Sequence, residues 1–424
     1  MVRFKGVRGA PDILPQESST WQRIEDAARA VLRRYGYAEI RTPIFERTEL
    51  FVRGIGEGTD IVERQMYTFT DQGQESLTLR PEGTAPIVRA YLEHRMAAQS
   101  PLVKVHYMGP MFRRERPQSG RYRQFHQIGV EAIGSDQPAV DAEVIALLWA
   151  LLVEELRIPG LQLCLNSIGD AACRPQIRDR ILRYMRDRAS ALCPDCQRKL
   201  ERNPLRILDC KQEGCQRLVA GAPKPLESLC EACAGHFAQV RGLLDLLKIA
   251  YSIDDRLVRG LDYYTRTAFE VVNPRLGAQN ALAGGGRYDG LIEVMGGPPT
   301  PGIGFAIGLE RVIASLPEEA EAEDGLQGVY VATIGQEAYR TGMLLVAELR
   351  RRGVRGLIDL EGRSLKSQMR QANKDRVRFC LILGEDELAK GHVTLRNMAK
   401  GEEQSIALDH VVVRLLELEG VGSR

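Results

Sequence analysis

Residues 102–134 read LVKVHYMGPMFRRERPQSGRYRQFHQIGVEAIG, and the organisation of this stretch decides the fold. Its two ends show the alternation of apolar and polar residues that is typical of β-strands. The polar segment between them, PQSGRY, contains the proline, serine and glycine that favour a turn. The sequence therefore predicts two antiparallel strands within an antiparallel β-sheet.

Helix and strand patterns extend outward from these two strands. Apolar spacing predicts helices over residues 18–36 and 141–158, and the second helix is so apolar that it needs cover from its own sheet or from a partner subunit. Strand patterns cover residues 37–51, 161–167 and 265–272. We expect an α+β fold in which helices flank an antiparallel sheet.

The chain divides by composition into four parts. Residues 1–170 and 246–320 carry strand and helix patterns, whereas residues 171–245 are rich in arginine and cysteine and predict an inserted, mostly helical module. The acidic segment LPEEAEAEDG indicates a solvated linker. Strands alternate with helices over residues 326–424, ending in the strand HVTLR and a last helix, which predicts a separate α/β domain.

The overall composition is that of a water-soluble protein, with 27% charged residues, 44% apolar residues and a net charge of +2. The segment MVRFKGVRGAPDILP has no apolar run of signal-peptide length, and the longest apolar run, ten residues from Val144, is too short to span a bilayer. We expect a cytoplasmic protein whose nine cysteines are thiols or metal ligands rather than disulfides.

Two segments predict a nucleotide site. In FRRERPQSGRYRQF, Arg113 and Glu115 alternate on one strand face and Phe125 lies on the partner strand. An arginine fork suits phosphate and an aromatic face can stack a base, although a solvated hairpin is the simpler alternative. In GIGFAIGLERV, a glycine-spaced strand enters a helix where Arg311 could reach a phosphate or merely pair with Glu310. The segment GGGRYDGL lacks the GK[ST] ending of a Walker loop.

A second group of polar residues lies in segments that otherwise look buried. LVRGLDYY places Arg259 and Asp262 beside two tyrosines, and buried charges need a partner in the protein or in a ligand. Asp262 could simply orient Arg259 or cap a turn. In TLRPEGT, Glu82 and Thr84 could simply start a helix. That simpler interpretation is weakened by Gln127 and Glu131, which share one face of another strand and also need partners.

Together these segments resemble a known family. FRRE with the RQF strand, and GIGFAIGLERV, resemble the second and third signature motifs of class II aminoacyl-tRNA synthetases. LVRGLDYY and GGGRYDGL resemble two motifs particular to histidyl-tRNA synthetases of the bacterial type, and RGAPDILP and TLRPEGT fit the N-terminal part of that family. The resemblance covers essentially the whole chain. It implies that L-histidine is ligated to tRNA(His) at the expense of ATP, through a histidyl-adenylate and with Mg²⁺.

The resemblance also implies roles for individual residues. Arg113 and Arg259 are expected to act on the α-phosphate as catalytic residues. The residues expected to bind ATP are Arg113, Glu115, Arg121, Phe125 and Arg311. The residues expected to bind histidine are Glu82, Gly83, Thr84, Arg113, Gln127, Glu131, Arg259, Tyr263, Tyr264 and Tyr288.

The resemblance further implies contacts with tRNA and with a second subunit. Arg116 and Gln118 lie in the loop that meets the acceptor end of the tRNA in this family. Residues 326–424 are expected to bind the anticodon, and residues 336–376 hold ten Lys or Arg against five Asp or Glu; a solvated basic helix face is the alternative. A homodimer is expected because catalytic domains of this kind dimerise.

The cysteines form two C-x2-C pairs, Cys193 with Cys196 and Cys230 with Cys233, separated by 33 residues. Two such pairs can together bind one structural zinc ion, although their spacing is long for a zinc ribbon. Reduced thiols without a metal are the favoured interpretation, since zinc is not part of the general chemistry of the family.

Three other functions compete with this interpretation. The regulatory subunit of ATP phosphoribosyltransferase is a histidine-binding relative that lacks the anticodon-binding domain and whose motifs are degraded. A class II synthetase for proline or threonine would share the terminal domain but not LVRGLDYY and GGGRYDGL. A protein that only binds RNA would not need Glu82, Gln127 and Glu131 together.

Overall fold

The computed structural model describes residues 4–118, 120–317 and 327–420. The chain forms two compact units, Met1–Pro317 and Glu318–Arg424, which are described separately below. The acidic segment expected to be a linker falls on residues 318–326 and so lies outside the described residues. No helix in the described ranges is long and apolar enough to cross a membrane.

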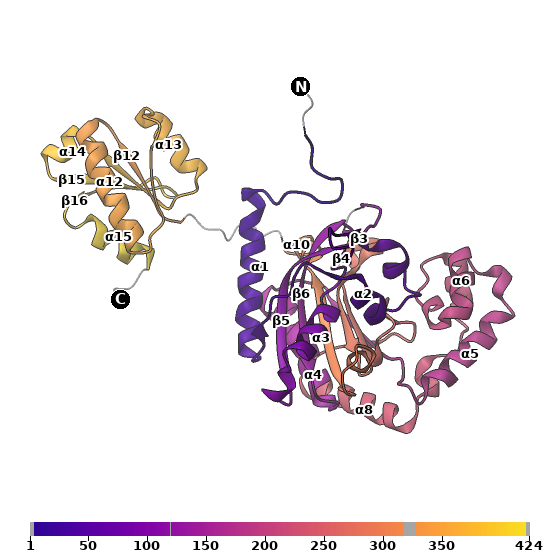
Figure 1. Cartoon of the computed structure of the whole chain (residues 1–424). Helices are drawn as coiled ribbons and strands as arrows, with labels where there is room; N and C mark the ends of the chain where they lie inside the picture. Colours follow the sequence, from indigo (N-terminus) through magenta and orange to yellow (C-terminus); the bar gives the residue numbers. More distant parts are fainter. Residues whose placement is uncertain (1–3, 119, 318–326, 421–424) are drawn as a thin grey trace. The chain divides into compact units, whose positions relative to one another are not determined.

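The first unit is built on an eight-stranded sheet with the strand order β1-β5-β6-β11-β10-β9-β7-β8 (Figure 1). The six central strands are antiparallel to their neighbours, and the two short edge strands are parallel to theirs. Their bounds are β1 Ala38–Glu39, β5 Val103–Phe112, β6 Gln124–Ile133, β7 Gln162–Ser167, β8 Ser252–Ile253, β9 Thr265–Val272, β10 Ala281–Arg287 and β11 Gly302–Gly308. The predicted hairpin is confirmed, with Val103 opposite Ile133 and Phe112 opposite Gln124.

Three long helices share a core with this sheet: α1 Pro15–Arg34, α4 Pro138–Trp149 and α8 Glu231–Leu246. The apolar helix predicted from the sequence is α4, which continues as a π-helical stretch over Ala150–Glu155. Val144, Leu147 and Leu148 of α4 are fully buried among sheet residues and α8. The chain therefore covers this helix itself, and no partner subunit is needed for that purpose.

Two predictions from the sequence are wrong near the N-terminus, one at the start of α1 and one between α1 and β5. The first helix begins at Pro15 rather than residue 18, because proline suits the first helical turn. Residues 37–51 were expected to be strand-like throughout, but Thr48–Ile55 form helix α2. Phe51 and Ile55, four residues apart, are both buried, so the helical period governs there.

A small three-stranded sheet and helix α3 complete this region. Strand β2 (Phe45–Arg47) pairs with β4 (Ser76–Leu79), which in turn pairs with β3 (Tyr67–Thr70). Helix α3 (Thr84–Glu93) follows β4 and packs near the short helix α9 (Leu291–Val294). The start of α3 is buried, which places TLRPEGT inside the molecule.

The predicted insert is helical, with α5 Arg174–Arg186, α6 Pro194–Arg202 and α7 Glu213–Val219 around a core of their own (Figure 1). Helix α8 joins two cores, because Cys233 packs with the insert while Val240 and Leu244 pack with the main sheet. The residue limits 171–245 stay a prediction.

The second unit has a five-stranded sheet in the order β13-β12-β14-β15-β16. Its elements are β12 Val329–Thr333, α12 Gln336–Arg351, β13 Gly356–Ile358, α13 Leu365–Lys374, β14 Phe379–Leu383, α14 Glu385–Ala389, β15 His392–Asn397, β16 Glu403–Ala407 and α15 Val411–Glu419. The alternation over the first part gives parallel strands, as expected. Strand β16 and helix α14 were not expected; β16 is mostly exposed and polar, so it shows no apolar alternation.

Candidate active site

A cavity of about 230 Å³ opens in the first unit, over the central strands of the large sheet and the start of α3. Most of the predicted site residues line it, although they come from segments up to about two hundred positions apart. They are Glu82, Thr84, Arg113, Glu115, Arg121, Phe125, Gln127, Glu131, Arg259, Tyr263, Tyr264, Tyr288 and Arg311. The antiparallel pairing of β6, β11, β10 and β9 brings them together.

Glu82 closes one end of the cavity and begins helix α3. Its carboxylate accepts hydrogen bonds from the backbone N–H groups of Thr84 (2.7 Å) and Ala85 (2.9 Å). Burial raises the pKa of Glu82, and these hydrogen bonds partly oppose that rise. Tyr263 donates a longer hydrogen bond of 3.5 Å to the same carboxylate. Glu82 is thus a carboxyl group held in place by hydrogen bonds and facing a cavity, where it could bind a cationic group.

Glu131 lies beside it on β6 and is fully buried. Its two oxygens accept hydrogen bonds from the hydroxyl groups of Thr84 (2.7 Å) and Tyr288 (2.6 Å). Burial raises the pKa of Glu131 to about 8. A Cβ atom on Gly304 would lie only 2.1 Å from the Glu131 carboxylate, so this side chain fits only because β11 carries a glycine there.

Gln127 lies two positions from Phe125 and four from Glu131 on the same strand. The side-chain carbonyl oxygen of Gln127 is buried and has no hydrogen-bond partner among the described residues. The rings of Tyr263, Tyr264 and Tyr288 form the opposite surface, with the Tyr263 centroid 4.7 Å from that of Tyr264 and 5.9 Å from that of Tyr288. A buried acceptor without a partner beside aromatic walls indicates a site for a polar ligand.

Arg259 lies over β10 and β9. The charge of this residue in the LVRGLDYY segment needed a partner, and the structure provides one in Glu270. The Arg259 guanidinium donates a 2.7 Å hydrogen bond to Glu270 and lies 5.8 Å from the ring centre of Tyr264. Burial alone would lower the pKa of Arg259, but the neighbouring Glu270 carboxylate raises it. Gly284 provides room, because a Cβ atom there would lie 2.1 Å from the guanidinium.

Strand β5 ends at Phe112, so Arg113 and Glu115 lie in the loop after it and not on one strand face as expected, while Phe125 lies on β6. The Arg113 guanidinium lies 5.2 Å from the centre of the Phe125 ring and donates a hydrogen bond to the Pro81 carbonyl oxygen at 2.9 Å. Burial lowers the pKa of Arg113, which reflects the cost of holding this cation in the cavity. Glu115 forms an ion pair with Arg121 at 3.4 Å. The cavity wall here combines a cation and an aromatic face.

Arg311 enters the same part of the cavity from helix α10 (Leu309–Ile313). It donates hydrogen bonds to the carbonyl oxygens of Gly120 (3.1 Å) and Ala281 (2.6 Å). Glu310, which was considered as a partner for Arg311, instead accepts hydrogen bonds from the backbone and ring of His126 at 2.8 and 3.1 Å.

Three predicted residues lie elsewhere. Gly83 precedes α3 beneath the cavity, where a Cβ atom would lie 2.2 Å from the Tyr107 ring. Arg116 and Gln118 are exposed in the loop between β5 and β6, away from the cavity lining. Gln118 faces a separate hollow formed with the N-terminal segment RGAPD.

Sequence analysis missed several residues that shape the cavity. Glu270, the partner of Arg259, was not singled out, although it is the one acidic residue in the strand TRTAFEVV. Tyr107 and Tyr122 also line the cavity. The buried ion pair between Arg287 and Asp141, at 2.6 Å, lies beside Tyr288 in sequence and fixes the end of β10. Arg287 and Asp141 are 146 positions apart, and Arg259 and Glu270 lie 11 positions apart in a loop and a strand, so pattern analysis connects neither pair.

The two C-x2-C pairs do not share a site, contrary to the considered zinc arrangement. Cys193 and Cys196 group with Cys210 and Cys215, whereas Cys230 and Cys233 group with Cys173 and Asp170. Cys164 and Cys380 belong to neither group and lie in strands β7 and β14.

The antiparallel sheet, with an arginine hairpin and a strand-to-helix motif around one cavity, defines the class II aminoacyl-tRNA synthetases. The chain matches the model of the histidyl-tRNA synthetase family over residues 9–312 and that of the anticodon binding domain over residues 328–418. It is 52% identical to a histidine–tRNA ligase of Desulforamulus reducens over 96% of this chain and 97% of that protein, and 52% identical to that of Moorella thermoacetica over 96% of each.

Solved structures agree with these sequence comparisons. The crystal structure of apo Staphylococcus aureus histidyl-tRNA synthetase superposes with a TM-score of 0.81 at 39% identity and covers 97% of this chain and 99% of that one. The chain belongs to the histidyl-tRNA synthetase family. It is an enzyme that charges tRNA with histidine at the expense of ATP.

Proposed function

We propose that the cavity binds histidine at its Glu82 and Glu131 end and ATP at its Arg113, Phe125 and Arg311 end. The observation that carries this proposal is the division of charge along one continuous cavity. Buried carboxylates lie at one end, and arginines with an aromatic ring lie at the other. Arg259 stands between the two ends.

Histidine is recognised by groups that match its own. The Glu82 carboxylate and the Gln127 carbonyl accept from the α-ammonium, with Thr84 holding the start of α3 in place. Glu131 accepts from one imidazole N–H, and Tyr264 contacts the other ring nitrogen, with Tyr263 and Tyr288 closing the pocket. A side chain without an imidazole would leave buried polar groups unpaired, which makes such a site selective.

The first reaction joins histidine to ATP. The carboxylate of histidine attacks the α-phosphorus, forming histidyl-adenylate and releasing pyrophosphate. Negative charge accumulates on the α-phosphate oxygens, and Arg113 and Arg259 stabilise it from two sides. Phe125 stacks on the adenine, Glu115 accepts from its amino group, and Arg121 and Arg311 hold the outer phosphates. In the second reaction, the terminal ribose hydroxyl of tRNA attacks the histidyl carbonyl and AMP leaves.

Mg²⁺ is expected with ATP, and the ATP end of the cavity offers the oxygen ligands that it prefers. Glu115, Glu270 and Glu310 line this end. Glu115 is paired with Arg121 and Glu270 with Arg259, whereas among the described residues Glu310 contacts only His126 and has no arginine partner, so it is our choice of side-chain ligand. An ion held there would supply positive charge against the phosphate oxygens of ATP.

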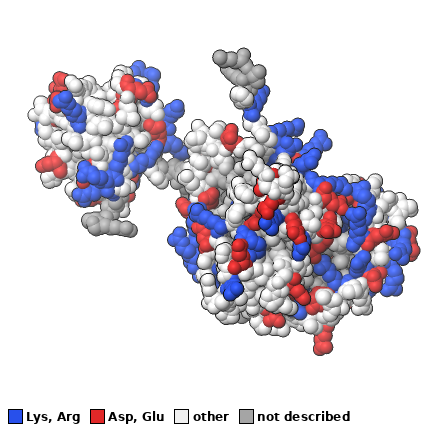
Figure 2. Space-filling model, viewed as in Figure 1, with Lys and Arg blue, Asp and Glu red and all other residues white. Residues whose placement is uncertain are grey.

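Transfer to tRNA requires surfaces outside the cavity. We assign Arg116 and Gln118, which are exposed in the loop between β5 and β6, to the acceptor end of tRNA(His). We assign residues 326–424 to the anticodon, and residues 1–170 and 246–320 to catalysis. Figure 2 shows basic side chains grouped on the second unit and interrupted by acidic ones. Such groups favour binding to a phosphate backbone.

We also propose that the enzyme is a cytoplasmic homodimer. Support for dimerisation comes from Ile44, Phe45 and Phe69, which are all more than 40% exposed on or next to the three-stranded sheet. Neighbouring exposed apolar side chains of this kind are typical of an interface. A cytoplasmic location follows from the need to meet tRNA where it is used.

Amino-acid-dependent exchange of pyrophosphate into ATP tests the first reaction and its specificity. All twenty amino acids are compared with the wild-type protein and with Arg259→Ala. We expect exchange with histidine alone and a loss of about 10²–10³-fold in the variant, because one charge-stabilising group is removed. Arg256→Ala, an exposed arginine three residues earlier, is the matched control and should stay within about twofold of wild type.

Three other results of the exchange assay would count against this proposal. Exchange with a different amino acid would contradict the assignment of Glu131 and Tyr264 to imidazole recognition. Full exchange by Arg259→Ala would contradict the catalytic role of Arg259. Histidine binding without exchange in the wild type would favour a regulatory relative.

A further inference from the structure

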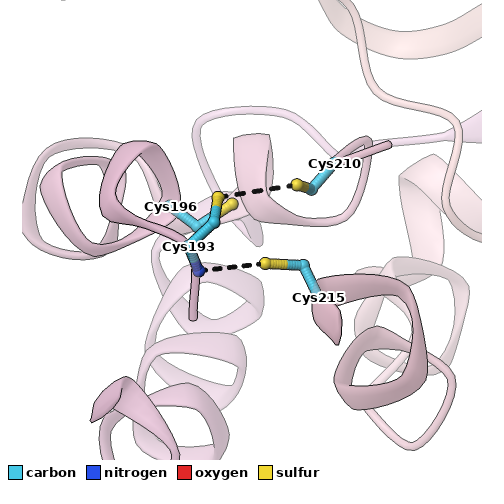
Figure 3. A group of neighbouring side chains, drawn as sticks. All are labelled: Cys193, Cys196, Cys210 and Cys215. Atoms are coloured by element: carbon cyan, nitrogen blue, oxygen red, sulfur yellow. Dashed lines mark hydrogen bonds between the residues drawn. The ribbon is translucent and has the colours of Figure 1, made fainter. Parts of the chain in front are cut away.

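Four cysteines of the insert form a compact group (Figure 3). The sulfur atoms of Cys193, Cys196, Cys210 and Cys215 all lie within 4.8 Å of one another, and the Cys193–Cys210 separation is 3.9 Å. A tetrahedral zinc ion with bonds of about 2.3 Å to sulfur separates its ligands by about 3.8 Å. The group therefore has nearly the size of a metal-bound one.

A second group lies where the chain enters and leaves the insert. One carboxylate oxygen of Asp170 and the sulfur atoms of Cys173, Cys230 and Cys233 also lie within 4.8 Å of one another. The Cys173–Cys233 sulfur separation is 3.8 Å, and the Asp170 oxygen lies 3.7 Å from Cys173 and 3.9 Å from Cys230. Three cysteines and one carboxylate are a donor set that zinc accepts.

The two groups are built on the same local motif. Cys193 caps helix α6 with φ −65° and ψ 156°, and Cys230 caps helix α8 with φ −68° and ψ 162°. In both motifs the second cysteine lies three residues later, in the first turn of the helix, and is buried. The same helix N-terminal motif thus occurs twice, and each time two further ligand atoms from elsewhere in the chain converge on it. Cysteines that only fill a hydrophobic core would not be expected to repeat this arrangement.

The remaining cysteines support the same conclusion. All seven cysteines of the insert and of helix α8 belong to one group or the other. The measured sulfur separations are nearly twice the 2.05 Å of a disulfide bond, so these pairs are not disulfides. A purely packing role would not require four ligand atoms to converge at each of two places.

We propose that the insert binds two structural zinc ions, one held by Cys193, Cys196, Cys210 and Cys215 and the other by Asp170, Cys173, Cys230 and Cys233. Each cysteine binds as a thiolate, so binding releases the thiol protons to solvent. Soft sulfur ligands in a tetrahedral arrangement select zinc over magnesium or calcium. The chemistry of the active site does not involve either ion.

The ions would stabilise a module that contacts the histidine site. Asn203, which follows helix α6, donates a 2.8 Å hydrogen bond to Asp262, and Arg206 donates one of 2.9 Å to the carbonyl of Gly260. Asp262 directly precedes Tyr263, and Gly260 lies three positions before it. Asp262 therefore neither orients Arg259 nor lines the cavity, and its role is to fasten this loop to the insert. A metal-held insert would keep the tyrosine wall of the site in position.

Metal analysis of the full-length protein, purified without a histidine tag, tests the proposal. Inductively coupled plasma mass spectrometry should find about two zinc ions per chain. Cys196→Ser and Cys233→Ser should each lower the count by about one. Cys164→Ser is the matched control, because Cys164 lies in strand β7 outside both groups, and this variant should keep both ions.

A second measurement avoids the risk that a variant fails to fold. The wild-type protein is titrated with an organomercurial that blocks thiols, and released zinc is followed with a chromogenic chelator. Zinc should appear as the thiols react, to a total of about two ions per chain. Less than about 0.2 zinc per chain in the starting protein, or iron in place of zinc, would overturn the proposal. These readouts do not depend on tRNA charging, so they stand or fall separately from the function above.

Discussion

At the scale of single residues, Glu131 shows how burial sets the properties of the site. Its carboxyl group is held by two hydroxyl donors and has no exposed surface. Because burial raises its pKa to about 8, the folded chain retains a proton at neutral pH that the unfolded chain has lost. The contribution of Glu131 to the free energy of unfolding of the ligand-free protein therefore falls as the pH rises.

The pH dependence of stability tests this directly in Glu131→Gln. Between pH 4.5 and 8 the folded state binds the extra proton, so the free energy of unfolding of the wild type falls as the pH rises through this range. Glutamine carries no such proton. The free energy of unfolding of the variant, taken relative to that of the wild type, should therefore rise by about 3 kcal/mol between pH 5.5 and 8.5. Urea unfolding without ligands measures this difference.

The exposed position Glu293 provides the control for loss of one negative charge. Glu293→Gln should follow the wild-type pH profile. A constant difference between Glu131→Gln and wild type across the range would mean that the buried carboxyl group does not titrate there.

The residues that we assign to ligand binding were accessible from the sequence mainly through the family motifs. Arg113 and Phe125 could also be placed close together, because the register of the hairpin brings the end of β5 beside the start of β6. Glu270 could not be connected with Arg259 in this way. Arg259 lies in a loop and Glu270 lies 11 positions later in strand β9, and no periodic pattern relates a loop residue to a strand residue.

At the scale of elements, the ion pair between Arg287 of β10 and Asp141 of α4 joins a strand to a helix. Both side chains are fully buried, and Arg287 also contacts Asp289 at 3.0 Å. The pair fixes the end of β10, from which Tyr288 enters the cavity. It is a structural pair beside a binding residue.

Removing one partner should be costly. Asp141→Ala leaves the Arg287 cation buried with less compensation, and we expect a loss of about 3–5 kcal/mol in the free energy of unfolding. Asp136→Ala, at an exposed position in the loop before α4, is the control and should change stability by less than about 0.5 kcal/mol. Urea denaturation measures both. Equal stability of the two variants would show that the buried pair contributes little.

The contact between the insert and the LDYY loop gives a separate prediction. Asn203→Ala removes the hydrogen bond to Asp262, worth about 1 kcal/mol, and should raise KM for histidine about fivefold while leaving KM for ATP nearly unchanged. Arg198→Ala, exposed on α6, should leave both values as in wild type. Steady-state pyrophosphate exchange measures them. A rise in both KM values would indicate general damage rather than a local effect on the histidine end.

At this scale, helices and strands were predictable from the sequence where a single hydrophobic pattern runs over many residues. The long strands β5 and β6 and the apolar helix α4 carry clear patterns, and all three are confirmed. Helix α2 was mistaken for a strand because TELF was read as a continuation of the preceding strand pattern, and four residues are too few to separate the two periods. Strand β16 was missed because its polar side chains face solvent.

At the scale of the whole molecule, the two units each have their own hydrophobic core. The active-site cavity lies wholly within the first unit. The chemistry of histidine activation and the recognition of the anticodon are thus assigned to separately packed parts of one chain.

A fragment ending at Pro317 tests this division. It retains every residue that lines the cavity, so it should exchange pyrophosphate with histidine at a rate within about threefold of the full chain. Its kcat/KM for charging tRNA should fall at least tenfold, a loss of about 1.4 kcal/mol in binding. Parallel exchange and charging assays on the two proteins provide the comparison. Undiminished charging would contradict the assignment of the anticodon to residues 326–424.

The glycines beneath the cavity have a consequence for the evolution and engineering of substrate choice. At Gly284, Gly302 and Gly304 even one added carbon would collide with Arg259, Tyr288 or Glu131. The floor of the site is therefore resistant to gradual remodelling, because an added carbon at Gly302 or Gly304 would meet the Tyr288 ring or the Val130 backbone, and one at Gly284 would displace the Arg259 guanidinium. A laboratory library aimed at a new amino acid would find its usable diversity in the walls and not in strands β10 and β11.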